Sequence, residues 1–162
     1  RLSQLDRVRS FGRTSLYDSL VRAADLFKLA QGRRALVVFT DGEDVSSRGS
    51  ADTVRTALQG KDVVLYVAGQ GRAAEDRELR DRLRAMAAET GGAALFASKM
   101  SALDEHFTEI AQDIGNQYVL TYTPDRPLGD GAWRQIRVEL SKRQHDVRAR
   151  QGYFAARSTD PR

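Results

Sequence analysis

A chain of 162 residues, 41% of them apolar, is long enough to form one domain with a buried core. It has no Cys and only two His, His106 and His145, which excludes a disulfide framework, a thiolate metal site and a histidine cluster. Its 26 basic and 22 acidic residues are interspersed and leave a net charge of +4, so the composition is not that of a dedicated nucleic-acid-binding protein.

In chain order, the hydrophobic pattern predicts helices alternating with short apolar strands. The first helix is expected to begin at Ser15, where Ser15 and Asp18 form a pattern similar to a capping box. The strands are predicted at 35–40, 62–68 and 93–97, and the helices that follow them near 50–59, 79–87 and 103–114. Strands separated by helices favour parallel pairing, so we expect a doubly wound, mainly parallel α/β sheet with helices on both faces.

The last third of the chain has a different pattern. Residues 117–123, 133–140 and 147–154 are predicted to form antiparallel strands. We therefore divide the chain into an α/β part at 1–116, an antiparallel β extension packed on it at 117–156, and a disordered tail at 157–162.

Basic residues are concentrated in this extension. They are Arg134, Arg137, Lys142, Arg143, Arg148 and Arg150. We interpret them as a solvated face that protects a sheet edge from further pairing, and a surface for an anionic partner is the alternative.

The strand at 35–40 ends at a carboxylate. Asp41 follows five apolar residues and a threonine, and Glu43 and Asp44 add negative charge beside it. In open α/β sheets ligands bind beyond the carboxyl ends of the strands, which makes Asp41 a candidate ligand or catalytic group. An aspartate that only starts a turn is the alternative interpretation.

Two motifs together resemble a von Willebrand factor A-like (VWA) domain. Arg-Thr-Ser-Leu-Tyr-Asp at 13–18 precedes a helix, and a strand ending in Thr-Asp-Gly-Glu-Asp at 40–44 follows it. With Gln-Gly-Tyr-Phe at 151–154, these segments are similar to a bacterial, acidobacterial-type branch of the family. The resemblance implies a metal-ion-dependent adhesion site in which Thr14 and Asp41 are ligands of Mg²⁺ or Mn²⁺. It also implies a protein partner that binds through an acidic residue, and it favours an extracytoplasmic or secreted location.

The family's Asp-x-Ser-x-Ser motif is absent from these residues. The nearest segment, Asp-Val-Ser-Ser-Arg at 44–48, ends in Arg and follows the wrong strand. The resemblance implies that the family's first three strands and early helices precede Arg1, so we interpret this chain as the C-terminal part of a domain. A start at Arg1 rather than Met agrees with a fragment or a processed product. We therefore expect metal binding to be weak or absent in this chain, and one edge of the strand at 35–40 to be left unpaired.

The function that these patterns favour is a non-enzymatic protein-interaction module. The sequence has no Gly-x-Ser-x-Gly, no His-Glu-x-x-His and no Cys nucleophile. The alternative is a metal-dependent hydrolase or phosphoryl-transfer enzyme that uses Asp41 and Asp44.

The segment Gly-Gln-Gly-Arg-Ala-Ala at 69–74 is similar to a dinucleotide-binding fingerprint, but the helical apolar pattern after it begins only at Leu79. No apolar stretch approaches the roughly 20 residues of a membrane-spanning helix, so we expect no membrane insertion by this segment. The residues assign neither a compartment nor an oligomeric state.

Overall fold

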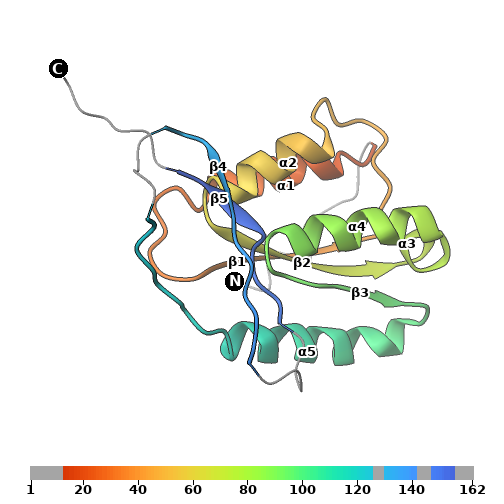
Figure 1. The fold of residues 1–162 in the computed structure, drawn as a ribbon. Coiled ribbons are helices and arrows are strands. Elements are labelled where there is room, and N and C mark those ends of the chain that lie inside the picture. Colours follow the sequence, from red (N-terminus) through yellow and green to blue (C-terminus); the bar gives the residue numbers. More distant parts are fainter. Residues whose placement is uncertain (1–12, 126–129, 142–146, 156–162) are drawn as a thin grey trace.

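The computed structural model describes residues 13–125, 130–141 and 147–155. Over these ranges the protein is mixed α/β, with a three-stranded parallel sheet, helices packed against it and a separate two-stranded antiparallel sheet (Figure 1). The predicted α/β class is confirmed. The predicted tail at 157–162 lies outside the described residues.

The parallel sheet has the strand order β1 (Arg34–Thr40), β2 (Val63–Gln70) and β3 (Ala94–Ala97). Arg34 pairs with Val63 at the start of β1, and Val67 pairs with Ala94 at the start of β3. The central strand β2 is buried along most of its length because it has a strand on each side and helices on each face. The three apolar runs that predicted strands are therefore confirmed, with shifts of one or two residues at their ends.

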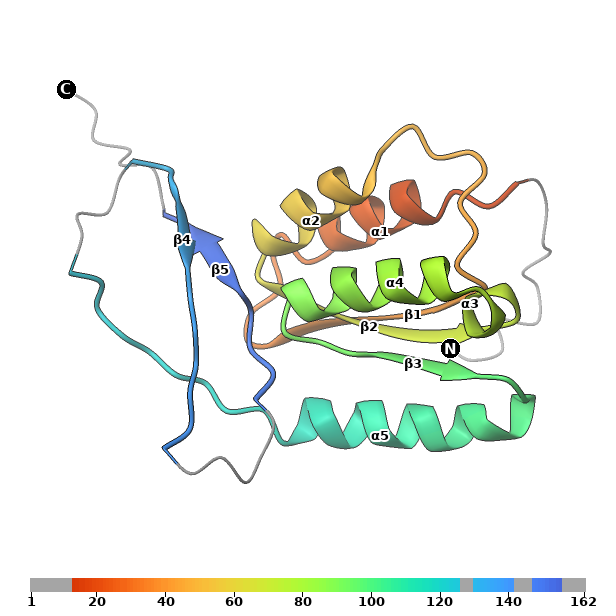
Figure 2. The same ribbon diagram turned by 45° about the vertical axis from the view of Figure 1, so that its right-hand side comes forward.

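The helices form two layers on either side of this sheet. On one side lie α1 (Leu16–Asp25), α2 (Ala51–Gln59) and α4 (Arg77–Glu89), and on the other lies α5 (Leu103–Gly115) (Figure 2). The core of the first side is formed mainly by Leu16, Leu20, Val54, Leu58, Leu65, Val67, Leu83 and Met86. That of the second side is formed by Tyr66, Ala68 and Ile110. Apolar residues at helical spacing thus cover the apolar faces of the strands.

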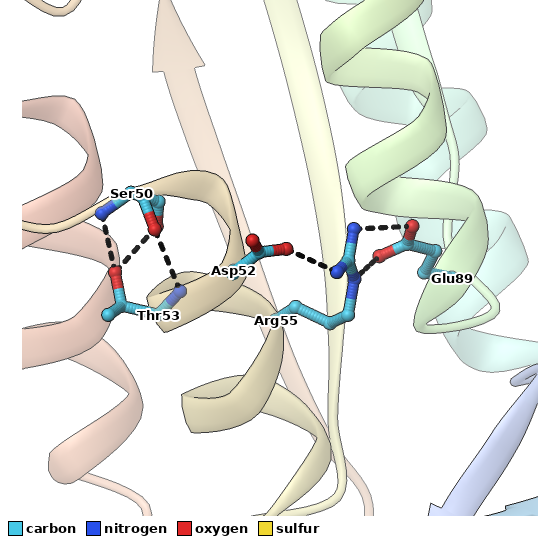
Figure 3. A network of polar contacts seen from close by, with 5 residues as sticks. All are labelled: Ser50, Asp52, Thr53, Arg55 and Glu89. Atoms are coloured by element: carbon cyan, nitrogen blue, oxygen red, sulfur yellow. Dashed lines mark hydrogen bonds and ion pairs between the residues drawn. The ribbon is translucent and has the colours of Figure 1, made fainter.

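Two polar networks fix α2. Ser50 and Thr53 form a capping box, in which each side chain accepts a hydrogen bond from the backbone N–H of the other (Figure 3). Further along the helix, the guanidinium of Arg55 binds both carboxylate oxygens of Glu89 at the end of α4 and also pairs with Asp52. Arg55 therefore ties α2 to α4 across the face of the sheet.

A short helix, α3 (Arg72–Glu75), was not predicted. It ends at Glu75, and the carboxylate of the next residue, Asp76, accepts the backbone N–H groups of Glu78 and Leu79 and so caps α4. Helical structure after β2 therefore begins at Arg72, well before the apolar pattern that starts at Leu79.

The antiparallel extension is shorter than predicted. Strands β4 (Trp133–Gln135) and β5 (Gly152–Phe154) pair with each other, and the Ile136 N–H donates to the Gln151 carbonyl beyond them. The strand predicted at 117–123 is wrong. Among the described residues that segment has no strand partner, and its large apolar side chains are exposed. An apolar pattern specifies a strand only where a neighbouring strand forms hydrogen bonds with its backbone N–H and C=O groups.

The extension lies at the amino ends of the parallel strands (Figure 2). Arg148 pairs with Asp113 of α5 and Arg150 pairs with Asp62 ahead of β2, each at 2.5 Å. Asp113 also accepts the hydroxyl of the buried Tyr66 at 2.6 Å. Burial and this bond to Asp113 raise the pKa of Tyr66 to about 12.

Candidate functional site at the carboxyl end of β1

Asp41 lies immediately beyond β1, as the strand-end pattern predicts. Its Oδ1 atom accepts the Glu43 N–H at 3.2 Å, and the Thr40 hydroxyl accepts the Gly42 N–H at 3.0 Å. These two bonds turn the chain sharply at the end of the strand. Within the described ranges, only one oxygen of the Asp41 carboxylate accepts a hydrogen bond. The turn-forming role is therefore compatible with a second role for the other oxygen.

Thr14 reaches the same end of the sheet. Its carbonyl oxygen accepts three hydrogen bonds from the loop that follows Asp41: from the Val45 N–H at 3.0 Å, the Ser46 N–H at 3.1 Å and the Ser46 hydroxyl at 3.0 Å. The Ser15 and Ser46 hydroxyls also lie 2.7 Å apart. We call the surface formed by residues 13–15 and 41–49 the Asp41 rim. Thr14 is exposed there.

The loop after β2 forms another side of this rim. Gly42 has a positive φ of 84°, and a Cβ at this position would lie 3.1 Å from the Cβ of Ala73. A Cβ at Gly71 would lie 3.9 Å from that of Asp41. Arg72 pairs with Glu43 across the gap between the two loops. Glycine at 42 is thus required both by its backbone conformation and by the close approach of α3.

Asp44 caps α1 from a distant part of the chain. Its carboxylate accepts the Tyr17 N–H at 2.8 Å through one oxygen and the Ser47 N–H at 2.9 Å through the other. Burial raises the pKa of Asp44, but hydrogen bonds from Ser47, Tyr17 and Ser46 outweigh it and hold the pKa below its ordinary value. Asp44 is therefore a structural residue of the rim, in a role that sequence analysis missed.

The capping box predicted at Ser15 and Asp18 is wrong. The Ser15 side chain makes no cap hydrogen bond, and the carboxylate of Asp18 accepts the N–H groups of Arg48 and Gly49 at 3.1 and 2.9 Å. These two bonds lower the pKa of Asp18. Asp18 of α1 thus binds the far end of the 41–49 loop. Asp44, in the middle of the loop, binds the start of α1.

The rim brings the two predicted metal ligands, Thr14 and Asp41, onto adjoining loops. Both offer oxygen, which is the ligand type that Mg²⁺ and Mn²⁺ take in proteins. Across the described residues, no three His, Cys, Asp or Glu side chains gather in a group that could hold a metal ion. The carboxylates near Asp41 are instead engaged with backbone N–H groups or, for Glu43, with Arg72.

The residues of two other motifs make contacts within the fold. A Cβ at Gly69 would lie 2.6 Å from the ring of Phe96, so this glycine is needed for packing of β2 against β3. In the extension, each arginine that the structure describes has an acidic partner. The pairs are Arg134–Asp130, Arg137–Glu139, Arg148–Asp113 and Arg150–Asp62. Lys142 and Arg143 lie outside the described residues.

Comparison of the chain with models of protein families gives no match, and comparison with curated proteins gives none either. In the part of the chain that the structure describes, no helix has the length and apolar character needed to cross a membrane.

Proposed function

We propose that this chain is the C-terminal part of a doubly wound VWA-like domain and acts as a non-enzymatic protein-interaction module. The single observation that carries the proposal is the Asp41 rim. There the carbonyl of Thr14 accepts hydrogen bonds from the loop that begins at Asp41. This loop leaves the carboxyl end of the parallel strand β1. This end of an open α/β sheet is where ligands bind.

In this proposal a divalent cation at the rim links the module to its partner. The Thr14 hydroxyl and the Asp41 carboxylate supply two oxygen ligands, directly or through water, and an acidic residue of the partner supplies another. Two ligands from the protein make a weak site, because affinity for a hard cation rises with the number of charged oxygens around it. We therefore expect strong binding only in a protein that also contains the upstream Asp-x-Ser-x-Ser segment.

The hydrolase alternative requires Asp44 as a second catalytic or metal-binding carboxylate beside Asp41. Both oxygens of Asp44 already accept backbone N–H groups, one of them at the start of α1. Moving this carboxylate onto a metal would leave the Tyr17 N–H without its partner. The geometry of the rim thus favours an interaction module over an enzyme with an aspartate pair.

Calorimetric titration with Mg²⁺ tests this proposal on two proteins, the 162-residue chain and a version extended upstream to include Asp-x-Ser-x-Ser. We expect no measurable binding to the first and clear binding to the second. In the extended protein, Asp41→Asn should weaken Mg²⁺ binding roughly tenfold or more because it removes a charged ligand. Thr14→Ala in the same protein should weaken the binding less. Asp52→Asn is the matched control, since the Asp52 side chain is 79% exposed on α2 and pairs with Arg55.

Two results would contradict the proposal. One is tight Mg²⁺ binding to the short chain that persists in Asp41→Asn. The other is metal-dependent phosphatase activity of the extended protein that is lost in Asp41→Ala, which would instead establish the hydrolase.

A further inference from the structure

A cleft of about 320 Å³ lies between the antiparallel extension and the end of α4. Residues 136–138 and 147–151 of the extension line it, together with Ala88 near the end of α4 and Gly92 ahead of β3. The extension lies at the amino ends of the parallel strands, so this cleft is at the opposite end of the sheet from the Asp41 rim (Figure 2). We call it the extension cleft.

Backbone contacts hold the two sides of the extension cleft together. The Gln151 N–H donates to the Glu89 carbonyl at 3.3 Å, and the Ile136 N–H donates to the Gln151 carbonyl at 2.8 Å. The chain at Arg150 passes so close to Gly91 that a Cβ at Gly91 would lie 2.8 Å from the Arg150 backbone nitrogen. The cleft is therefore part of the folded structure, as most small-molecule sites are before their ligand binds.

The charged groups of the extension cleft all have the same sign. Arg137, Arg148 and Arg150 line it, and none of the Asp or Glu residues that the structure describes does. Arg148 and Arg150 each donate through one nitrogen to an acid outside the lining, Asp113 and Asp62 respectively. Because a guanidinium carries several N–H donors, the other donors of these arginines remain for an anion in the cleft.

Arg137 is the arginine that exchanges its partner most easily. Its side chain is 83% exposed, and that of its partner Glu139 is 68% exposed. Ion pairs between such exposed side chains are weak because water screens them. An anion that enters the cleft can therefore take the place of Glu139 at little cost.

The uncharged part of the lining is mainly apolar, and the volume of the cleft limits the size of a ligand. The apolar lining residues include Ile136, Val138, Val147 and Ala149. At about 30 Å³ for each water molecule in the liquid, the cleft has the volume of roughly ten waters. It therefore has room for a molecule of roughly ten non-hydrogen atoms, which is the size of a small organic acid.

We propose that the extension cleft binds a small organic acid. The carboxylate pairs with Arg137 and its neighbouring arginines, and the apolar body packs against Ile136, Val138 and Ala149. A planar carboxylate fits the planar guanidinium group, whereas a neutral molecule gains nothing from it. The inference goes beyond the proposed function, because it uses the other end of the sheet and requires no metal.

Octanoate, an acid of this size, is the probe for the first test. Amide chemical shifts of the full chain are followed by NMR while octanoate is added in the presence of a chelator. We expect saturable shifts confined to residues 136–138 and 147–151 and to Ala88 and Gly92. Octanamide, which has the same shape without the charge, should bind several-fold more weakly. Butyrate, which has a shorter apolar body, should also bind more weakly, and inorganic phosphate should give no saturable shift.

A charge variant tests the role of the exposed arginine. Arg137→Gln should weaken octanoate binding roughly two- to fivefold, because it removes one exposed charge contact. The matched control is Arg77→Gln, because Arg77 is 88% exposed and also pairs with a nearby acid, Asp81, but does not line the cleft. This control should leave the affinity unchanged.

Three results would overturn the proposal. The first is the absence of octanoate-dependent shifts at the cleft, and the second is equal binding of octanoate and octanamide. Either of these needs no variant and would mean that the arginines serve only the ion pairs of the extension. The third is equal weakening in Arg137→Gln and Arg77→Gln, which would indicate a response to net charge rather than a site. Because every titration contains a chelator, none of these results bears on the Mg²⁺ proposed at the Asp41 rim.

Discussion

At the scale of single residues, Asp18 and Asp44 make the fold sensitive to acid. Both carboxylates accept backbone N–H groups, and the pKa of each is held below the ordinary 3.8. A lowered pKa in the folded state stabilises the protein above the unfolded pKa, and this contribution is lost as the pH falls through the folded pKa.

We therefore predict that the free energy of unfolding, measured by urea denaturation, is steady from pH 7 to about 5 and falls below about pH 4. Asp18→Asn and Asp44→Asn should each lower stability at neutral pH and reduce the slope in the acid range. Asp52→Asn, which changes an exposed aspartate, should leave the slope as it is. A steep acid slope that persists in both Asp18→Asn and Asp44→Asn would show that other carboxylates govern it.

At the scale of secondary-structure elements, Arg55 makes an ion pair between α2 and α4. The guanidinium of Arg55 reaches both oxygens of Glu89, whose side chain is 21% exposed, whereas the other partner, Asp52, is 79% exposed. A planar guanidinium fits this two-point contact in a way that an ammonium group does not.

A double-mutant cycle of Arg55→Ala and Glu89→Ala should give a coupling of about 0.5–1 kcal/mol, modest because the arginine side chain is 42% exposed. The corresponding cycle with Asp52→Ala should give a coupling near zero. Arg55→Lys should recover less than half of the Arg55–Glu89 coupling. Equal coupling to both acids would indicate a diffuse charge effect rather than a specific bond between the two helices.

The parallel sheet could be predicted from sequence, and the antiparallel extension only in part. Each of β1, β2 and β3 is an uninterrupted apolar run between polar loops, a local signal that needs no knowledge of the neighbours. Residues 117–123 have an equally apolar pattern, but a strand also requires a partner for its backbone groups. Tyr118 and Leu120 are instead 93% and 74% exposed. Pairing between short strands depends on long-range packing, which the local pattern does not contain.

The candidate site was predictable to a similar extent. The position of Asp41 could be predicted from the end of an apolar strand. Thr14 was predicted as a ligand only from the family resemblance, not from a physical rule. The capping of α1 by Asp44 could not be predicted, because the carboxylate and the Tyr17 N–H are separated by 27 residues. Sequence rules for helix caps search only the adjacent residues, and here those residues pointed to Ser15 and Asp18.

At the scale of the whole molecule, the response of stability to metal distinguishes a weak site from a strong one. A ligand that binds only the folded state raises the unfolding temperature once its concentration exceeds the dissociation constant. With two expected ligands, Thr14 and Asp41, we predict that millimolar Mg²⁺ leaves the thermal midpoint of the 162-residue chain unchanged relative to chelator. A clear rise that Asp41→Asn removes would show that the short chain already forms a complete site.

The order of the strands along the sheet has a consequence for how the chain folds. Because β1, β2 and β3 are neighbours in the sheet in the same order as in the sequence, each pairing closes only the helical segment between two consecutive strands. The extension, in contrast, is joined to the sheet by contacts such as Arg150 with Asp62, which are 88 residues apart. Closing long loops costs more entropy and slows folding. In a pulse-labelled refolding experiment, amide protection should therefore appear in the three parallel strands before it appears in the hairpin.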